Sequence, residues 1–129
     1  MQRKLRQLVF VGEIYLDRLF RQLLRQPSAR EISRYQPVRR DFSLIFPDTV
    51  HWEAVGSALA GLAIAELRDY RPAEIFRDAK GKAVPAGHHS MLVAATFQSL
   101  ERTLRDEELH TWSNSIVSAL ESLGGKLRA

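Results

Sequence analysis

The architecture of this chain is clearest in the segment Ser99-Leu-Glu-Arg-Thr-Leu-Arg-Asp-Glu-Glu-Leu109, where a strand gives way to a helix. Thr103 is expected to be the N-cap of that helix, with Asp106 three positions later in the place of a capping-box acid. The acidic run from Asp106 to Glu108 then puts negative charge into the first turn, where the helix dipole favours it. This segment therefore predicts a well-defined helix start behind a strand.

From Arg39 onward, the apolar spacing predicts the order strand, helix, strand, strand, helix, strand. In the first strand, residues 39–46, apolar side chains alternate on one face. Asp48 or Thr49 is expected to cap the first helix, whose apolar stripe is Trp52, Val55, Leu59 and Leu62. The other predicted elements are strands over residues 65–76, 90–98 and 126–129, and a helix over residues 104–123 that stops at Gly124-Gly125.

Two helices at this spacing cover one face of a four-stranded antiparallel sheet, which is the α+β ferredoxin-like sandwich. Pro72 indicates that its strand lies at an edge or carries a bulge. The face of the sheet away from the helices is expected to be small and polar, with Asp41, Ser43, Ser90, Ala94, Thr96 and Gln98.

Residues 1–36 form a separate part in this interpretation. A strand is predicted over residues 7–15 and a helix from Leu16 to Leu24, followed by an extended linker. One strand and one helix cannot enclose a core, so this extension is expected to pack on something else. Residues 37–129 then make up the ferredoxin-like domain.

Composition excludes several protein classes. The 129 residues are 45% apolar and 26% charged, as in ordinary globular proteins, and no apolar run approaches a membrane span. The absence of cysteine excludes disulfides and fits a cytoplasmic protein. Residues 1–40 hold ten Lys or Arg against three acids, whereas residues 41–129 hold nine against twelve. Nucleic-acid binding by the domain therefore requires a local basic patch rather than bulk charge.

Such a patch is predicted in the loop that carries Arg77, Lys80 and Lys82, beside His88-His89. These side chains are candidates for phosphate or base contacts, although a solvated turn has the same composition. The two histidines make a poor metal site, because neighbours on a strand point to opposite faces and nothing completes the ligand shell. The sequence contains no Gly-rich phosphate loop, catalytic triad or zinc signature, so we expect neither catalysis nor a cofactor in this chain.

Several motifs in fixed order resemble one family. They are Phe10-Val-Gly-Glu-Ile-Tyr-Leu-Asp-Arg-Leu, Arg40-Asp41, Phe76 followed by Gly81, Pro85-x-Gly87 and Ser90, Thr96-Phe97, and Arg102-Thr-Leu-x-Asp-Glu-Glu108. Together they resemble the C-terminal ferredoxin-like anticodon-binding domain of bacterial phenylalanyl-tRNA synthetase beta subunits. The resemblance implies a cloned fragment of a larger protein, or a stand-alone relative.

In that family the beta subunit pairs with an alpha subunit, which joins phenylalanine to tRNA with ATP and magnesium. The resemblance thus implies three partners, namely tRNA(Phe), the alpha subunit and the remainder of the beta subunit. It implies that this chain grips the anticodon stem-loop and leaves catalysis to the alpha subunit.

The resemblance also implies which residues meet RNA. The family's F-D-x-Y motif and a later Ser contact the anticodon; Ser90 matches that Ser, but Arg77 stands at the Asp position and Ala79 at the Tyr position. A substitute stacking plane is expected from His88, His89, Tyr70 or Arg77. The full predicted RNA-binding set is Arg40, Arg77, Asp78, Lys80, Lys82, His88, His89, Ser90 and Thr96.

Two other functions fit the same predicted fold. One is a protein-interaction or regulatory module whose open sheet face packs on another chain and binds no RNA. The other is a small acylphosphatase-like hydrolase, whose strand-to-helix loop would cradle phosphate with backbone amides. Pro47 and Asp48 in that loop argue against the hydrolase, because one lacks an amide hydrogen and the other repels an anion.

Overall fold

A computed structural model describes residues 9–22, 26–29, 31–78 and 80–128 of the chain. It divides into two units, residues 1–31 and residues 32–129. In the first unit, α1 (Leu16–Leu19) is a single helical turn. Residues 9–15 form no strand, so the expected strand is wrong over that range, and residues 7–8 lie outside the described residues. An isolated strand has no neighbour for its backbone hydrogen bonds, and a short isolated helix is marginal in water.

The helix expected from Leu16 to Leu24 ends at Leu19 in the structure. Residues 23–25 lie outside the described residues. The large apolar side chains in the described part of this unit are exposed to solvent. Phe10 and Val11 are each 90% exposed, and Phe20 is 71% exposed. Apolar spacing alone thus overestimated how much regular structure this segment forms by itself.

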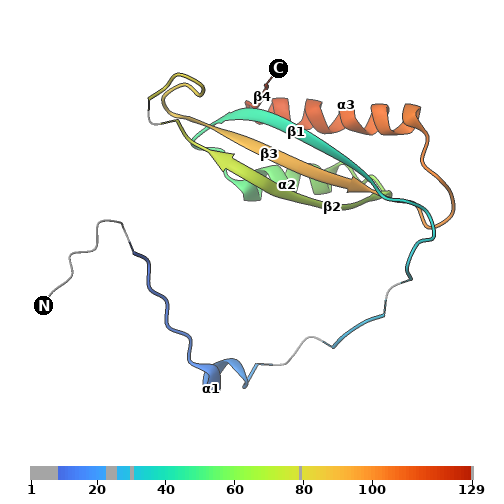
Figure 1. Ribbon diagram of the computed structural model, residues 1–129, viewed down its shortest axis with the longest axis horizontal. Coiled ribbons are helices and arrows are strands. Elements are labelled where there is room, and N and C mark those ends of the chain that lie inside the picture. The colour runs from blue at the N-terminus through green and yellow to red at the C-terminus, as the bar shows by residue number, and fades with distance from the viewer. Residues whose placement is uncertain (1–8, 23–25, 30, 79, 129) are drawn as a thin grey trace, which may run out of the picture. The chain divides into compact units, whose positions relative to one another are not determined.

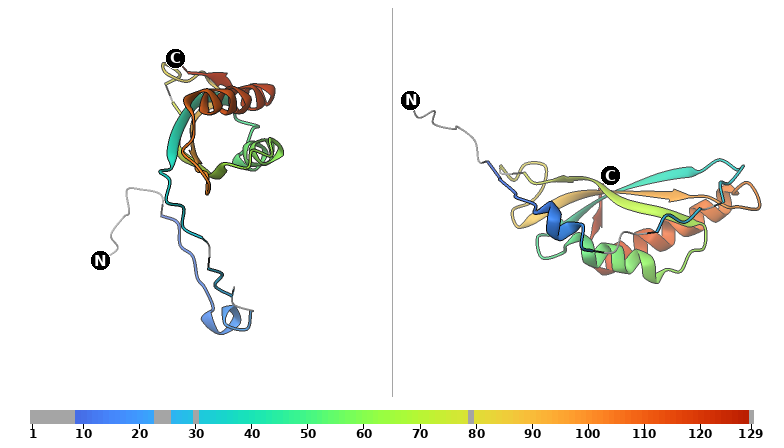
Figure 2. Two further views of the ribbon diagram at one scale, coloured as in Figure 1. Left: turned by 90° about the vertical axis from the view of Figure 1, so that its right-hand side faces the viewer. Right: turned by 90° about the horizontal axis from the view of Figure 1, so that it is seen from below.

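The second unit confirms the predicted order of elements. It consists of β1 (Val38–Pro47), α2 (Trp52–Gly61), β2 (Leu67–Phe76), β3 (His88–Phe97), α3 (Asp106–Ser122) and β4 (Lys126–Leu127). The strands form one antiparallel sheet in the order β2-β3-β1-β4. Both helices lie on the same side of this sheet, which leaves the other side uncovered within the unit (Figures 1 and 2). This is the ferredoxin-like arrangement.

The core lies between the sheet and the two helices. β1 contributes Phe42, Leu44 and Phe46, as the alternation predicted, and β3 contributes every second residue from Met91 to Phe97. From the helices come Val55, Leu59, Leu109, Ile116 and Leu120. Trp52 and Trp112 are only partly buried and pack against the rim of this core, with Trp112 stacked on Phe97.

Pro72 behaves as predicted on both counts. β2 is an edge strand, and its register against β3 shifts between Pro72 and Glu74. A second shift lies between Leu67 and Asp69. Proline cannot donate to a ladder hydrogen bond, so an edge position beside a bulge avoids an unmade bond.

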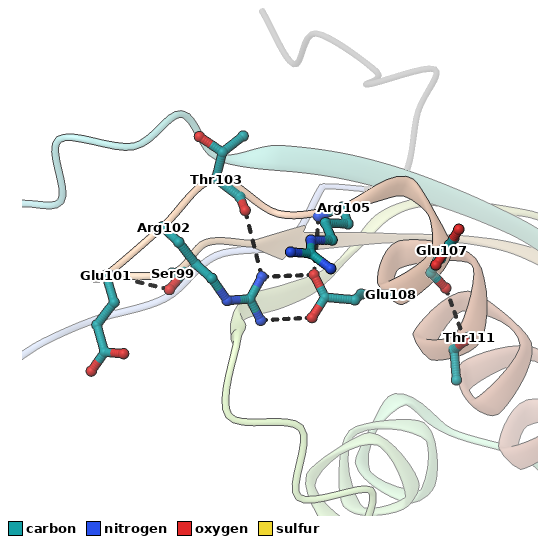
Figure 3. Close-up of polar contacts among 8 residues, drawn as sticks. All are labelled: Ser99, Glu101, Arg102, Thr103, Arg105, Glu107, Glu108 and Thr111. Carbon is teal, nitrogen blue, oxygen red and sulfur yellow. Dashed lines mark hydrogen bonds and ion pairs between the residues drawn. The ribbon is translucent and has the colours of Figure 1, made fainter.

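The start of α3 differs from the prediction. The helix begins at Asp106 and its N-cap is Arg105, so Thr103 is not the cap. The Glu108 carboxylate accepts a hydrogen bond from the Arg105 backbone N–H at 3.0 Å, and Arg102 donates to it from both terminal nitrogens at 2.7 and 2.6 Å (Figure 3). The Glu108 carboxylate therefore caps the helix by bonding to the backbone of the N-cap residue, and the Arg102 guanidinium holds that carboxylate in place. At α2 the N-cap is His51, which makes no side-chain cap bond, so neither Asp48 nor Thr49 has that role.

This contact predicts a pH dependence. The hydrogen bond from Arg102, followed by that from the Arg105 backbone, lowers the pKa of Glu108 from 4.5 to about 2. Because the pKa of Glu108 is lower in the folded than in the unfolded state, the ionised side chain stabilises the fold at pH values above its unfolded-state pKa. This stabilisation is lost as the pH falls to the folded-state pKa. Glu108→Gln is therefore expected to be less stable than the parent at neutral pH, with the difference shrinking between about pH 4.5 and 2.

Urea unfolding at a series of pH values measures that difference. Glu107→Gln is the control, because it removes a charge from the same helical turn at an exposed residue. A Glu108→Gln deficit that stayed constant down to pH 2 would contradict the ionic origin of the contact.

The closing strand is shorter than expected. β4 pairs only with Leu44 and Ile45 of β1, and the Arg128 backbone N–H adds one bond to the Ser43 carbonyl at 2.8 Å. Within the described part of the second unit, the outer edge of β1 from Val38 to Phe42 therefore has no strand partner; Ala129 lies outside the described residues.

No helix in the described ranges has the length and apolarity needed to cross a membrane.

Candidate nucleic-acid interface

We use the term open face for the side of the sheet opposite α2 and α3 (Figure 2). The strand register confirms that Asp41, Ser43, Ser90, Ala94 and Thr96 share it, as predicted. Leu92 and Ile45 lie on the same face, and β2 adds Asp69, Arg71, Glu74 and Phe76. The open face is thus less uniformly polar than the sequence indicated, because its edge strand carries charged and aromatic side chains.

A hollow of about 300 Å³ lies on this face. We call it the open-face hollow, and its lining residues are Ser43, Glu74, Phe76, Ser90, Leu92 and Arg128. Ser90 is 6% exposed and Phe76 is 43% exposed. The hollow combines an aromatic ring, hydroxyls, a carboxylate and a guanidinium, which are the groups that stack on bases and bond to their edges.

Of these residues, only Ser90 was predicted to contact RNA. Phe76 and Arg128 were missed as site residues, although Phe76 was noticed as part of a motif. Its place in an alternating strand was obscured by the shift at Pro72, and Arg128 lies in the short terminal segment. The one sequence signal for Phe76 as a site residue was its position directly before the loop that carries Arg77 and Lys80.

The loop between β2 and β3 is organised around Asp78. Its carboxylate accepts hydrogen bonds from the backbone N–H groups of Lys80, Lys82 and Ala83, at 2.9, 2.8 and 2.7 Å. These bonds, that from Ala83 foremost, lower the pKa of Asp78. Asp78 therefore holds the loop together and has little capacity left for an RNA contact. The side chains of Lys80 and Lys82 remain exposed, as a phosphate-binding role requires.

The two predicted histidines are separated by the sheet. His89 is 2% exposed, lies on the helix side near Phe46, and has its Nδ1 3.3 Å from Asp48 Oδ1. It cannot present a plane to RNA, so this part of the prediction is wrong. His88 is half-buried, with its Nδ1 3.1 Å from the Ala86 carbonyl, and remains on the open-face side.

Arg77 follows directly after β2 and is exposed. Its side chain is 61% exposed, and its Nε lies 3.5 Å from Asp48 Oδ1. An exposed pair at this distance contributes little to stability, so the guanidinium is free to exchange the carboxylate for a phosphate.

Arg40 does not belong to the open face. It is paired with Ala95 on the helix side and lines a different hollow with Asp106, Glu107, His110 and Ser113. Thr96 is instead opposite Arg39, whose Nε lies 2.8 Å from Asp41 Oδ1. Asp41 thus pairs with Arg39. The exposed cation of β1 on this face is Arg39.

Within the described ranges there is no group of three or more His, Cys, Asp or Glu side chains that could hold a metal ion. The open face and its neighbouring loop offer stacking, hydrogen bonding and positive charge. These are the properties of a binding surface for single-stranded nucleic acid.

Comparison with known proteins gives a consistent family. Residues 33–128 match the model of the ferredoxin-fold anticodon binding domain. The phenylalanine–tRNA ligase beta subunit of Bradyrhizobium diazoefficiens is 31% identical over 125 residues, which is 94% of this chain and 15% of that protein. Its counterpart from Pseudomonas fluorescens is 33% identical over 113 residues, covering 88% and 14%. That of Neisseria meningitidis serogroup A is 28% identical over 100 residues, covering 78% and 12%. The chain spans about one seventh of the length of these relatives.

Proposed function

Because this chain belongs to the ferredoxin-fold anticodon binding domain family, we propose that it binds the anticodon stem-loop of tRNA(Phe) within a phenylalanine–tRNA ligase beta subunit. The observation that supports this most strongly is that the family match, residues 33–128, covers nearly all of the second unit. That unit presents an uncovered sheet face with a hollow suited to a base.

RNA chemistry gives the binding mode. Bases of an anticodon loop are unstacked, so side chains can stack on them and hydrogen-bond to their edges. In this proposal the open face receives the bases. Arg77, Lys80 and Lys82, at the end of the same sheet, neutralise phosphates of the backbone.

A filter-binding titration tests the proposal. The 129-residue chain is expected to bind tRNA(Phe) more tightly than a non-cognate tRNA of similar length. Equal affinity for the two would leave only unspecific electrostatic binding. No binding to either would favour a protein-interaction module on the same fold.

The basic loop has its own test. The double variant Arg77→Ala/Lys80→Ala is expected to weaken tRNA binding and to reduce the slope of log K against log salt by about 0.7 for each lost phosphate contact. Both side chains are exposed, so folding should be little affected. Arg18→Ala/Arg21→Ala removes the same charge from exposed positions of the first unit and serves as the control. An unchanged slope in the loop variant would place the RNA elsewhere.

We propose further that residues 1–36 are the tail of a preceding module of the beta subunit and contact it. Two observations support this. The Bradyrhizobium similarity covers 125 residues and so extends beyond residues 33–128, and the segment exposes large apolar side chains such as Phe10 and Phe20. In such an assembly the alpha subunit would carry out aminoacylation in the cytoplasm with ATP and magnesium, while RNA binding by this chain would need no cofactor.

A further inference from the structure

We infer that residues 33–36 form a latch, closed by the side chains of Ser33 and Gln98, that makes these four residues move with the ferredoxin-like domain. They are the last residues of the tail proposed above, and the latch ties them to the domain. Every contact that supports the inference lies within the second unit, so the inference does not depend on RNA binding.

The ladder between β1 and β3 ends where the latch begins. Val38 is the first residue of β1 and lies opposite Phe97. The same antiparallel register would place Pro37 opposite Gln98, but proline has no N–H to donate to a ladder. The chain before Val38 therefore needs other hydrogen bonds to stay beside the end of β3.

The Gln98 side chain supplies one of these bonds. Its Nε2 donates to the Tyr35 carbonyl at 2.6 Å. The backbone of Gln98 is itself fixed from the β2 side, because its N–H donates to the Glu66 carbonyl at 2.9 Å. Its carbonyl accepts a further bond from Arg68 Nε, also at 2.9 Å. Gln98 is thus a firmly held residue whose side-chain amide joins β3 to the latch.

Ser33 closes the other end of the latch. Its hydroxyl donates to the carbonyl of Ser99 at 2.6 Å, and Ser99 is only 8% exposed. The same oxygen accepts a bond from the Tyr35 N–H at 3.1 Å, which holds the chain in a short turn. Ile32, directly before the latch, is 92% exposed. Docking on the domain therefore begins at Ser33.

Two further boundaries agree with these contacts. The second unit begins at Ile32, and the match to the family model begins at residue 33. An extended chain spans at most about 3.6 Å per residue, so docking four residues removes up to about 14 Å from the distance that the connection between the two units can bridge. The latch thus limits the reach of the domain, which raises its local concentration near a site that the other part of the same protein holds.

Backbone ¹⁵N relaxation of the 129-residue chain measures which residues move with the domain. In the unchanged chain, the order parameters of residues 33–36 are expected to match those of β1, at about 0.85, and to fall at Ile32. In the double variant Ser33→Ala/Gln98→Ala they are expected to fall below about 0.6. Unchanged values in β1 and β3 would show that the variant is folded. Gln36→Ala is the matched control, because it truncates an exposed side chain within the same four residues and should leave the order parameters as they are.

Gln98→Glu separates the hydrogen bond from the bulk of the side chain. It keeps the size of the residue but replaces the donating amide by a carboxylate, which only accepts hydrogen bonds. The bond to the Tyr35 carbonyl is therefore lost, and the order parameters of residues 33–36 are expected to fall as far as in Gln98→Ala. A Gln98→Glu variant that kept them at about 0.85 would contradict the role of this bond.

Trypsin gives a second measurement. The Arg34–Tyr35 peptide bond lies between the two latch contacts, so cleavage there requires the latch to open. Each neutral hydrogen bond shifts an equilibrium by roughly two- to tenfold, and the double variant is expected to be cut after Arg34 about tenfold faster than the unchanged chain. Cleavage after Arg21, an exposed residue of the first unit, is the internal reference and should keep its rate.

Two results would overturn the inference. One is an order parameter below about 0.6 throughout residues 33–36 of the unchanged chain. The other is a rate of cleavage after Arg34 that is the same in the double variant and the unchanged chain. Neither measurement involves RNA, so failure of the latch would leave the proposed function standing, and failure of tRNA binding would leave the latch standing.

Discussion

Replacing Phe97 by alanine is expected to lower the free energy of unfolding by about 3–5 kcal/mol. The side chain is fully buried at the end of β3, where Val38 and Leu67 are its partners in the two neighbouring strands. Its ring also stacks on Trp112 of α3, with the centroids 5.6 Å apart and the planes at 17°. Truncation would open a cavity between the sheet and α3, and the transfer free energy of the ring would be lost too.

Urea unfolding followed by Trp fluorescence and by circular dichroism measures this change. Small domains have only about 5–15 kcal/mol of stability in total, so the variant should unfold at a much lower urea concentration. Phe10→Ala is the matched control, because that ring is 90% exposed and its loss should change stability by less than about 0.5 kcal/mol. A Phe97→Ala deficit below about 1 kcal/mol would show that the ring does not hold α3 to the sheet.

Gly125→Ala is expected to lower the free energy of unfolding by about 1–3 kcal/mol. A Cβ atom at this position would lie 2.6 Å from a ring carbon of Phe46, 2.7 Å from the Leu120 carbonyl oxygen and 3.1 Å from a methyl of Leu44. The first contact is with a fully buried ring and the second is with backbone, so neither atom can move aside without disturbing the core. Overpacking therefore costs stability although the substitution adds a single methyl group.

Gly61→Ala provides the contrast. It stands at the end of α2 and has no heavy atom within 4 Å of an added Cβ. The same change there should be neutral or should raise stability by up to about 1 kcal/mol, because the unfolded chain loses backbone freedom. Equal effects at the two glycines would contradict the steric argument.

The two adjacent glycines illustrate how far the sequence could lead. Gly124-Gly125 correctly indicated where α3 stops, and Gly124 has the positive φ, +88°, that such an end requires. The role of Gly125 depends on Phe46 and Leu44, which lie about 80 residues away in the chain. Nothing in local sequence reveals that a strand passes so close.

The order of elements and the core were predictable because alternation and helical spacing record which faces are buried. The caps were less so. At α3, the Glu108 carboxylate bonds to the Arg105 backbone and is held by Arg102. Thr103 and Asp106 also have side chains that can cap a helix, so the sequence could not identify the capping residue. In the first unit, spacing predicted a strand that residues 9–15 do not form without a partner.

The candidate site was predicted in part. Ser90 and Thr96 lie on the open face, and Arg77, Lys80 and Lys82 lie in the loop between β2 and β3; their contacts with RNA stay a prediction. Arg40 and His89 lie on the helix side, because successive residues of a strand point to opposite faces of the sheet and both are next to a residue on the open face. The bulge after Pro72 shifts this alternation by one residue in β2. Strict alternation along the sequence therefore could not place Glu74 and Phe76 on the open face.

The short β4 has a consequence for self-assembly. Because it covers only Leu44 and Ile45, the earlier part of β1 presents unpaired backbone groups at a sheet edge, in the described part of the unit. Such an edge is a template on which another copy could add a strand and begin to aggregate. Three consecutive charged residues, Arg39, Arg40 and Asp41, stand along this stretch and are all exposed. Addition of a strand would remove water from these charged side chains, so the charge on this edge disfavours pairing between copies while the open face remains available.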